Sequence, residues 1–383
     1  MAIENFTTYN PVKLHFGKGI VSGLGKSTAK YGKKVLLIYG KGSVKKYGYY
    51  NQVVEQLKSA GLEIVEYPGI KPNPVIEDVR MATDLGRREN IDVIVALGGG
   101  SVIDSAKIIA IAMASGYDGW DIMKYRVKPE NAIPLLCVLT LAATGTEMNA
   151  GAVVQNHDTG EKIGFVNDLN FPKESFLDPA FTASVPKNYT VYGIVDLIAH
   201  ALEFYFGEGE PPVIDAITFE IIKDAMHYGP GLLDNLENID LRANIMLDAT
   251  LALNGLTRYG KKNGDWGVHA IGHELSLLYD MPHGASLSIV YIAWLTLQKD
   301  RIPARIQNLG NHLFGLDTVN ETIAALKTFF QSINAPVNLT DEGIGEDQKE
   351  IIINQLNKNE ASGMHHQLND EDRLEIVNTM FYQ

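Results

Sequence analysis

The chain has 383 residues, a formal net charge of −13 and one cysteine, Cys137. The length predicts about two domains, while the acidic charge excludes nucleic-acid binding through a basic face, and the lone cysteine excludes an internal disulfide or a cysteine-based metal site. Residues 1–10 lack the features of a secretory signal and no apolar run is long enough to cross a membrane, so we expect a cytoplasmic protein.

Short apolar runs and helical patterns alternate through the first half of the chain. Continuous apolar runs predict buried strands, and helical spacing between them predicts helices. In chain order these are a strand at Lys34–Tyr39, a helix at Val44–Ala60, a strand at Leu62–Tyr67, a helix at Val75–Glu89, a strand at Ile91–Leu97, a helix at Ser101–Ala114 and a strand at Pro134–Leu139. Strands that are apolar on both faces and separated by helices indicate a parallel sheet.

The pattern changes near Pro186, beyond which helices predominate. The predicted helices are Tyr189–Phe206, Ile214–His227, Leu241–Leu256, Trp266–Tyr279, Leu287–Gln298 and Asn320–Ile333. We therefore expect an α/β dinucleotide-binding domain at 1–187 and an all-α metal-binding and substrate domain at 188–383.

Glycine-rich turns follow two of the predicted strands. The residues Gly98 to Ser101 separate a strand from a helix, where backbone N–H groups can approach a pyrophosphate. The alternative interpretation is a tight strand-to-helix turn that binds no ligand, because glycines favour such a turn as well. The turn from Gly40 to Ser43 follows an earlier strand, but it is not the Rossmann fingerprint, because Lys45 occupies the third glycine position. A polar loop from Thr140 to Asn149 follows a third strand, and three such loops favour a dinucleotide site.

Acidic and histidine side chains interrupt two strongly apolar helices. Asp196 and His200 are four residues apart and share a helical face, as do His269 and His273, and His283 follows ten residues later. A hydrogen bond between Asp196 and His200 within a core would explain the first pair alone. A site of Asp196, His200, His269 and His283 would combine one carboxylate with three imidazoles, which suit zinc and ferrous iron alike.

Four motifs in this order resemble the iron-containing, group III alcohol dehydrogenase family. They are GGGSVIDSAK, TLAATGTE, DLIAHALE and HAIGHELSLLYDMPHG. The segments YGKGSVKKYG and DWGVHAIGHELS are most similar to its butanol dehydrogenase branch. The resemblance implies a dehydroquinate synthase-like architecture, a nicotinamide dinucleotide and one divalent metal, Fe²⁺ or Zn²⁺, in the cleft between two domains, and a homodimer.

The resemblance also assigns residues to the site. It implies that the metal ligands are Asp196, His200, His269 and His283, and that His273 is a catalytic histidine near the nicotinamide and substrate. The implied cofactor residues are Gly99, Gly100, Ser101 and Asp104 for the pyrophosphate, Thr140, Thr144 and Asn149 for other nucleotide contacts, and Lys162 beside the ribose.

The residue after the first predicted strand distinguishes the two nicotinamide cofactors. NAD-preferring relatives have an acidic residue there that binds both ribose hydroxyls, whereas this chain has Gly40, followed by Gly42, Ser43, Lys45 and Lys46. A carboxylate would repel a 2′-phosphate, while hydroxyl and ammonium donors bind one. We therefore predict that NADP(H) is preferred, with NAD(H) as the alternative cofactor.

The expected function is that of a metal-dependent alcohol dehydrogenase or aldehyde reductase. Its substrates would be short to medium neutral aldehydes and primary alcohols resembling butanol, because no arginine adjoins the metal motifs to bind a carboxylate or phosphate. One alternative is a polyol dehydrogenase or dehydroquinate synthase-like lyase on the same fold. A second alternative is a nucleotide-binding scaffold with a structural metal.

Overall fold

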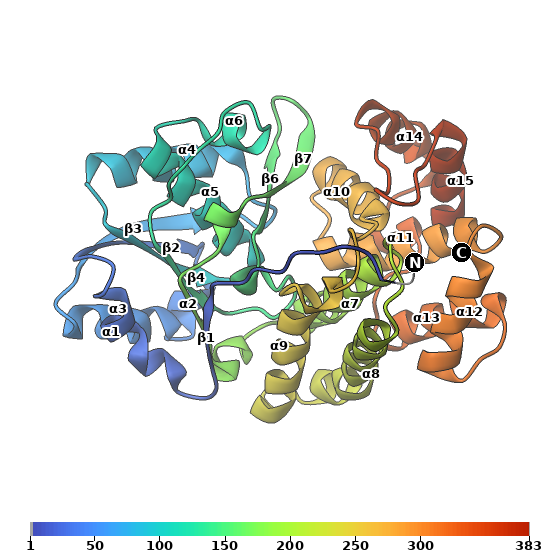
Figure 1. The fold of residues 1–383 in the computed structure, drawn as a ribbon, viewed down its shortest axis with the longest axis horizontal. Coiled ribbons are helices and arrows are strands. Elements are labelled where there is room, and N and C mark those ends of the chain that lie inside the picture. The colour runs from blue at the N-terminus through green and yellow to red at the C-terminus, as the bar shows by residue number, and fades with distance from the viewer. Residues whose placement is uncertain (1–2, 383) are drawn as a thin grey trace. The chain divides into compact units, whose positions relative to one another are not determined.

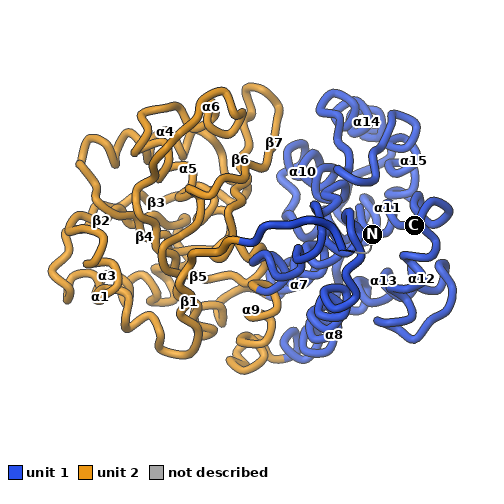
Figure 2. The backbone as a smooth tube through the Cα atoms, viewed as in Figure 1, with its two compact units in different colours: residues 1–8, 187–234, 251–383 blue, residues 9–186, 235–250 orange. Residues whose placement is uncertain are grey.

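The computed structural model describes residues 3–382 and divides into two compact units (Figure 2). The first, here called the sheet unit, comprises residues 9–186 and 235–250. The second, the helical unit, comprises residues 1–8, 187–234 and 251–383. The predicted fold class is confirmed, because one unit is built on a parallel sheet and the other on helices.

The sheet unit is built on six parallel strands in the order β1-β8-β5-β4-β2-β3. They are β1 (Lys13–Phe16), β2 (Lys34–Gly40), β3 (Glu63–Ile70), β4 (Val93–Gly98), β5 (Leu135–Leu139) and β8 (Glu174–Leu177). A separate antiparallel hairpin joins β6 (Gly151–Asn156) to β7 (Glu161–Val166). The apolar pattern predicts β2 to β5, but it does not predict β1, β6, β7 or β8, which are short or interrupted by polar residues.

Helices flank this sheet, and one predicted helix is divided in two. The helices are α1 (Leu24–Thr28), α2 (Ser43–Lys46), α3 (Tyr49–Ser59), α4 (Ile76–Arg88), α5 (Gly100–Ser115), α6 (Gly119–Met123) and α9 (Ile239–Leu253). The prediction of a continuous helix at Val44–Ala60 is wrong. Gly48 separates α2 from α3 with a φ of 79°, in the left-handed region that glycine adopts readily.

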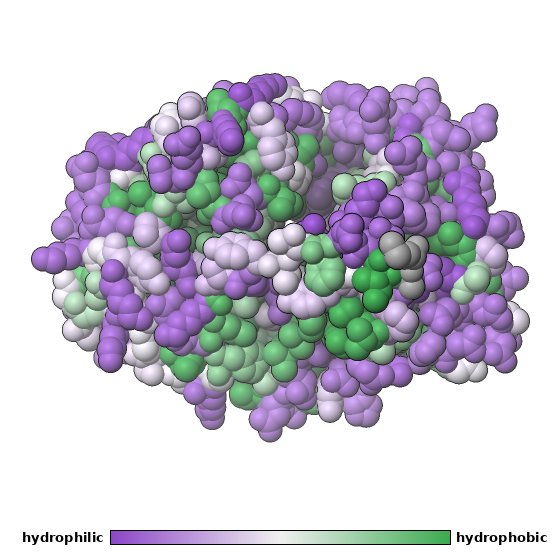
Figure 3. All heavy atoms as spheres, viewed as in Figure 1, coloured by the Kyte–Doolittle hydropathy of each residue, from purple (hydrophilic) through white to green (hydrophobic). Residues whose placement is uncertain are grey.

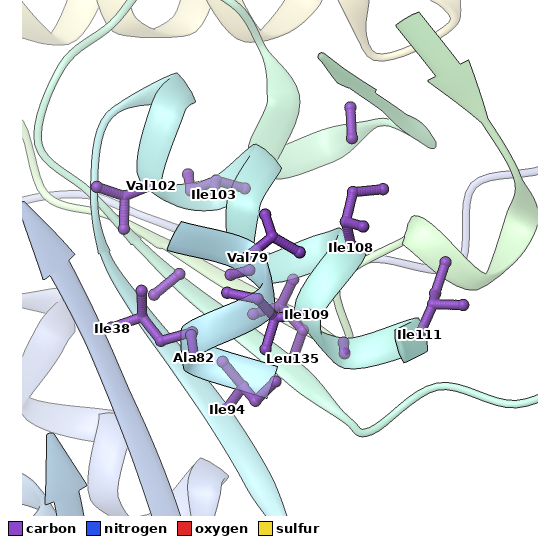
Figure 4. Packing of buried hydrophobic residues seen from close by; sticks show 14 of the residues in the cluster. Ile38, Val79, Ala82, Ile94, Val102, Ile103, Ile108, Ile109, Ile111 and Leu135 are labelled. Atoms are coloured by element: carbon purple, nitrogen blue, oxygen red, sulfur yellow. The ribbon is translucent and has the colours of Figure 1, made fainter. Parts of the chain in front are cut away.

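Apolar side chains bury both faces of the sheet. Ile94 of β4 belongs to a core cluster with residues of α4 and α5, whereas the next residue, Val95, belongs to a cluster with residues of α1 and α3. Figure 4 shows the first of these clusters, in which Val79 of α4 and Ile109 of α5 pack with Leu135 of β5. Successive strand residues point to opposite faces, so burial on both sides explains the continuous apolar runs in the sequence.

The strand order reverses between β2 and β4. The chain passes from β2 to β3 at one edge of the sheet and then returns to the other side of β2 with β4. In open parallel sheets, ligands bind outside the carboxyl ends of the strands at such a switch point. The turn after β2 (40–43) and the turn after β4 (98–101) both begin there.

The helical unit contains eight α-helices among the residues that the structure describes (Figure 1). They are α7 (Lys187–Tyr205), α8 (Pro212–Asp234), α10 (Gly267–Tyr279), α11 (His283–Gln298), α12 (Pro303–Phe314), α13 (Val319–Ser332), α14 (Lys349–Lys358) and α15 (Asp370–Phe381). Within residues 3–382, no helix has the length and apolar character needed to cross a membrane. On the face drawn in Figure 3, hydrophilic residues cover most of the surface around α12 to α15.

Candidate metal and nucleotide sites

One face of α7 presents three buried polar side chains. Asp196, His200 and Glu203 are separated by four and three residues, so they lie along the same side of the helix. All three are almost completely buried. Because an unpaired carboxylate in an apolar environment is costly, this face needs a positively charged partner or several hydrogen-bond donors.

Imidazole nitrogens from three helices surround one carboxylate oxygen. Asp196 Oδ1 lies 3.7 Å from His200 Nδ1, 3.8 Å from His269 Nε2 and 3.9 Å from His283 Nε2. Within residues 3–382, Asp196 Oδ1 and His269 Nε2 are buried without a hydrogen-bond partner. A tetrahedral cation ~2.1 Å from each donor requires donors ~3.4 Å apart. The donor atoms of Asp196, His200 and His269 all lie within 4.8 Å of one another, and His283 Nε2 approaches the same carboxylate oxygen, so this set of side chains suits one divalent ion.

The approach of α11 to α7 depends on a glycine. His283 is the first residue of α11, and Gly284 follows it. A Cβ atom at Gly284 would lie 2.1 Å from the Tyr192 carbonyl oxygen of α7, so only glycine permits this packing. The close contact brings the start of α11, and with it His283, to Asp196.

Glu203 fixes the orientation of His269. Its Oε1 accepts hydrogen bonds from the backbone N–H of His269 at 3.0 Å and from Nδ1 of the same residue at 2.8 Å, and its Oε2 accepts one from the backbone N–H of Trp266. When Nδ1 donates a proton to a carboxylate, Nε2 carries the lone pair that a metal needs. The sequence analysis does not identify Glu203, although an acidic residue in the apolar motif DLIAHALE is a signal of such a role.

The electrostatic environment of His269 favours positive charge. Burial lowers the pKa of His269, but the neighbouring carboxylates of Asp196 and Glu203 outweigh this effect and raise the pKa to about 9. Near Glu203, burial and the charge of that carboxylate raise the pKa of Asp265 to about 7. This concentration of acidic groups is suited to a cation.

His273 lies beside the four candidate ligands. It follows His269 by one turn of α10 and is partly exposed. Its ring centroid is 5.2 Å from that of His283 and 6.4 Å from that of His269. Among the residues that the structure describes, neither His273 nor His283 belongs to the group of three buried ligand candidates, Asp196, His200 and His269, whose donor atoms lie within 4.8 Å of one another. His283 nevertheless places its Nε2 3.9 Å from Asp196 Oδ1.

The nucleotide residues predicted from the sequence all lie in the sheet unit. Gly40 ends β2, while Gly42, Ser43 and Lys45 lie at or in α2; Gly99, Gly100, Ser101 and Asp104 lie at or in the first turns of α5; Thr140, Thr144 and Asn149 follow β5; and Lys162 lies on β7. Because β2, β4 and β5 are neighbours in the sheet, the first three groups follow adjacent strand ends.

The loop after β5 packs closely against the start of α5. The backbone N–H of Thr140 donates to the Gly98 carbonyl at 3.0 Å. A Cβ atom on Gly100 would lie 2.7 Å from Thr144 Cγ2, so a larger residue would push the loop away. Within residues 3–382, no side chain caps the N-terminus of α5, which leaves backbone N–H groups for an anion.

Three of the predicted cofactor residues already bond to the protein. Asp104 accepts hydrogen bonds from Thr146 Oγ1 and from the backbone N–H of Val153. Asn149 Nδ2 donates to the Gly145 carbonyl. Lys162 Nζ donates to Asn73 Oδ1 at 2.9 Å, which adds to the site a residue that the sequence analysis does not identify.

Lys45, in the turn after β2, also has partners within the protein. Its Nζ is 3.8 Å from Glu66 Oε2 and lies 4.5 Å and 5.0 Å from the ring centroids of Tyr50 and Tyr39. Both tyrosine hydroxyls donate to the Glu66 carboxylate. The side chain of Lys45 is half-exposed.

Comparison with known proteins identifies the family. A family model for iron-containing alcohol dehydrogenase matches residues 11–179, and one for the C-terminal part of the Fe-containing alcohol dehydrogenase family matches residues 190–381. The chain belongs to this family. The resemblance found in the sequence motifs is thereby confirmed.

Individual relatives cover almost the whole chain. A probable NADH-dependent butanol dehydrogenase of Bacillus subtilis is 40% identical over 98% of this chain and 99% of its own length. An NADPH-dependent aldehyde reductase of Escherichia coli is 35% identical, over 92% and 93% respectively. The crystal structure of an NADH-dependent butanol dehydrogenase A from Thermotoga maritima matches with a TM-score of 0.96 and 38% identity, covering 99% of both chains.

Proposed function

We propose that this alcohol dehydrogenase interconverts short to medium neutral aldehydes and primary alcohols, using NADP(H) and one divalent metal. The observation that carries the proposal is the arrangement of three imidazole nitrogens 3.7–3.9 Å from a buried carboxylate oxygen that accepts no hydrogen bond within residues 3–382. Relatives named as butanol dehydrogenases and an aldehyde reductase support the substrate class. They do not favour the polyol dehydrogenase or lyase alternative.

Asp196, His200, His269 and His283 would hold the metal, Fe²⁺ or Zn²⁺. When bound, the divalent cation supplies a Lewis acid for the substrate oxygen, and the nicotinamide supplies or accepts the hydride. Asp196 is the only carboxylate among the four candidate ligands, so the ligands neutralise one of the two charges of a dication. The remaining positive charge suits an oxygen that gains negative charge as an aldehyde is reduced.

His273 would hold the proton that the product oxygen takes up during aldehyde reduction. Its ring nitrogens can accept and donate a proton, and the side chain is partly open to solvent, so it can be reprotonated between turnovers. Its ring lies next to that of His283, with centroids 5.2 Å apart. This position suits a proton relay beside the ligands.

The preference for NADP(H) rests on the turn after β2. Relatives in this family are named as NADH-dependent and as NADPH-dependent enzymes, so this chain's own residues carry the proposal. Gly40 brings no carboxylate to this strand end, and Ser43 and the half-exposed side chain of Lys45 bring a hydroxyl and an ammonium group. A higher kcat/KM with NADH than with NADPH would overturn the preference.

The decisive experiment combines metal analysis of the purified protein with an aldehyde series assayed with both cofactors. We expect one divalent metal per chain, turnover of butyraldehyde, and loss of activity when a chelator removes the metal. Full activity without metal would refute the metal's role. Binding of cofactor without turnover of any aldehyde or alcohol would instead support the scaffold alternative. The homodimer and the cytoplasmic location remain predictions from the sequence.

A further inference from the structure

A buried lysine links the first turns of α5 to the segment that follows β5. Lys107 lies on α5 with no exposed surface. Its Nζ donates hydrogen bonds to Thr146 Oγ1 at 2.7 Å, to the Asn149 carbonyl at 2.9 Å and to the Gly151 carbonyl at 2.6 Å. One ammonium group therefore holds three points along residues 146–151.

Asp104, one turn earlier on α5, completes this network. Its Oδ1 accepts a hydrogen bond from Thr146 Oγ1 at 2.6 Å, and its Oδ2 accepts one from the backbone N–H of Val153 at 2.9 Å. The Thr146 hydroxyl thus accepts from Lys107 and donates to Asp104. The two opposite charges are joined through this hydroxyl, and neither remains buried without a partner.

The two elements joined in this way contain half of the predicted cofactor residues. The helix α5 carries Gly100 and Ser101 in its first turn, and the joined segment, 140–153, carries Thr140, Thr144 and Asn149. At the start of α5, contact between Gly100 and Thr144 sets how closely the two approach. Two turns further along the helix, the Lys107 network holds the same segment. The spacing of the two elements is consequently fixed at both places.

We propose that Lys107 is a positioning residue that holds the segment 140–153 against α5, so that the two elements form one preorganised dinucleotide site. The identity of the ligand rests on the proposed function. The positioning itself rests on the hydrogen bonds of Lys107, Asp104 and Thr146.

Stability alone gives little reason to bury these charges. Taking an ammonium group and a carboxylate out of water is costly, and apolar residues of similar volume often serve a core as well. Burial lowers the pKa of Lys107 to about 8 despite the nearby charge of Asp104. The buried site therefore disfavours the charged ammonium form relative to water. A fixed spacing between two ligand-binding elements is a benefit that directional hydrogen bonds provide and apolar packing does not.

The test compares two substitutions in the network with two matched controls. Lys107→Met removes the ammonium group, and Thr146→Val removes the connecting hydroxyl while both charges remain. The controls are Lys34→Met, which removes a lysine bonded to Glu89 at the start of β2, and Thr28→Val, which removes a buried hydroxyl of α1. Neither control residue belongs to the candidate sites.

The main measurement is the Kd of NADPH by direct fluorescence titration, well below the melting temperature of each variant. We expect Lys107→Met to raise this Kd at least about tenfold, and Thr146→Val about threefold, because hydrogen bonds that order the site are lost. The KM for NADPH should rise similarly, while kcat at saturating cofactor stays within about twofold. The controls should leave Kd unchanged. A folded Lys107→Met variant with the wild-type Kd would overturn the proposal.

If Lys107→Met does not fold, Thr146→Val decides, and a wild-type Kd for that variant would overturn the proposal. If the unaltered protein binds no dinucleotide, the proposed function fails. Amide hydrogen exchange then tests the positioning separately, because exchange at residues 144–151 should accelerate in Thr146→Val and not in Thr28→Val. Equal exchange in those two variants would overturn the positioning role.

Discussion

Replacing Glu203 by Gln tests whether a residue outside the candidate ligand set controls metal affinity. The carboxylate accepts three hydrogen bonds, two from His269 and one from the Trp266 backbone. An amide has one acceptor oxygen, so it can serve His269 only by turning its NH₂ group toward the N–H of Trp266. One hydrogen bond to a charged group is then lost, which corresponds to about 1.5–3 kcal/mol. We expect the metal Kd to rise about 10- to 100-fold.

The assay is a competitive Zn²⁺ titration against a chromophoric chelator, with the melting temperature of the metal-free protein as a check on folding. Glu274→Gln is the matched control, because Glu274 is also buried and its Oε2 accepts hydrogen bonds from the side-chain amides of Gln355 and Asn359. We expect this variant to bind Zn²⁺ as the unaltered protein does. A folded Glu203→Gln variant with an unchanged Kd, or an equal loss in Glu274→Gln, would refute the orienting role of Glu203.

Three other predictions concern the ligands, the cofactor and acid stability. His269→Ala should lose metal and activity together, whereas His273→Ala should keep the metal and lose about 10²- to 10⁴-fold in kcat; loss of metal from the His273 variant would contradict its assignment. Gly40→Asp has space, since its Cβ would lie 3.6 Å from the nearest atom, and it should lower kcat/KM for NADPH relative to NADH at least about tenfold; an unchanged ratio would count against the cofactor preference. Burial raises the pKa of Glu174, but hydrogen bonds from His15, Ser27 and Lys30 outweigh it and lower the pKa to about 2. A depressed carboxyl pKa stabilises the fold above the unfolded value near 4.5 and loses this effect as the pH falls toward 2, so Glu174→Gln should cost about 3 kcal/mol at pH 7 and progressively less below pH 4.5. Urea unfolding of both proteins at pH 7 and pH 3 measures this, and a difference that does not shrink with pH would be the contrary result.

The sequence predicts best what local periodicity encodes. Continuous apolar runs identify β2 to β5, because strands buried on both faces have no polar side. Spacing by four residues places Asp196 with His200, and His269 with His273, on common helical faces. The helix predicted at Val44–Ala60 shows the limit of periodicity, because the apolar pattern continues through Gly48, where the backbone turns. The edge strand β1, with four residues, is too short to show a pattern.

Contacts between distant segments were decided only by the tertiary structure. The sequence contains Glu203 and His269, but their 2.8 Å hydrogen bond joins residues 66 positions apart and depends on how α7 packs against α10. Lys107 reaches Gly151 across 44 positions in the same way. Periodicity determines which side chains share a face, whereas hydrogen-bond partners depend on distances between elements that only the folded chain fixes. The composition and motifs of this protein therefore determine its family and its candidate ligands, and tertiary packing decides which residues orient them.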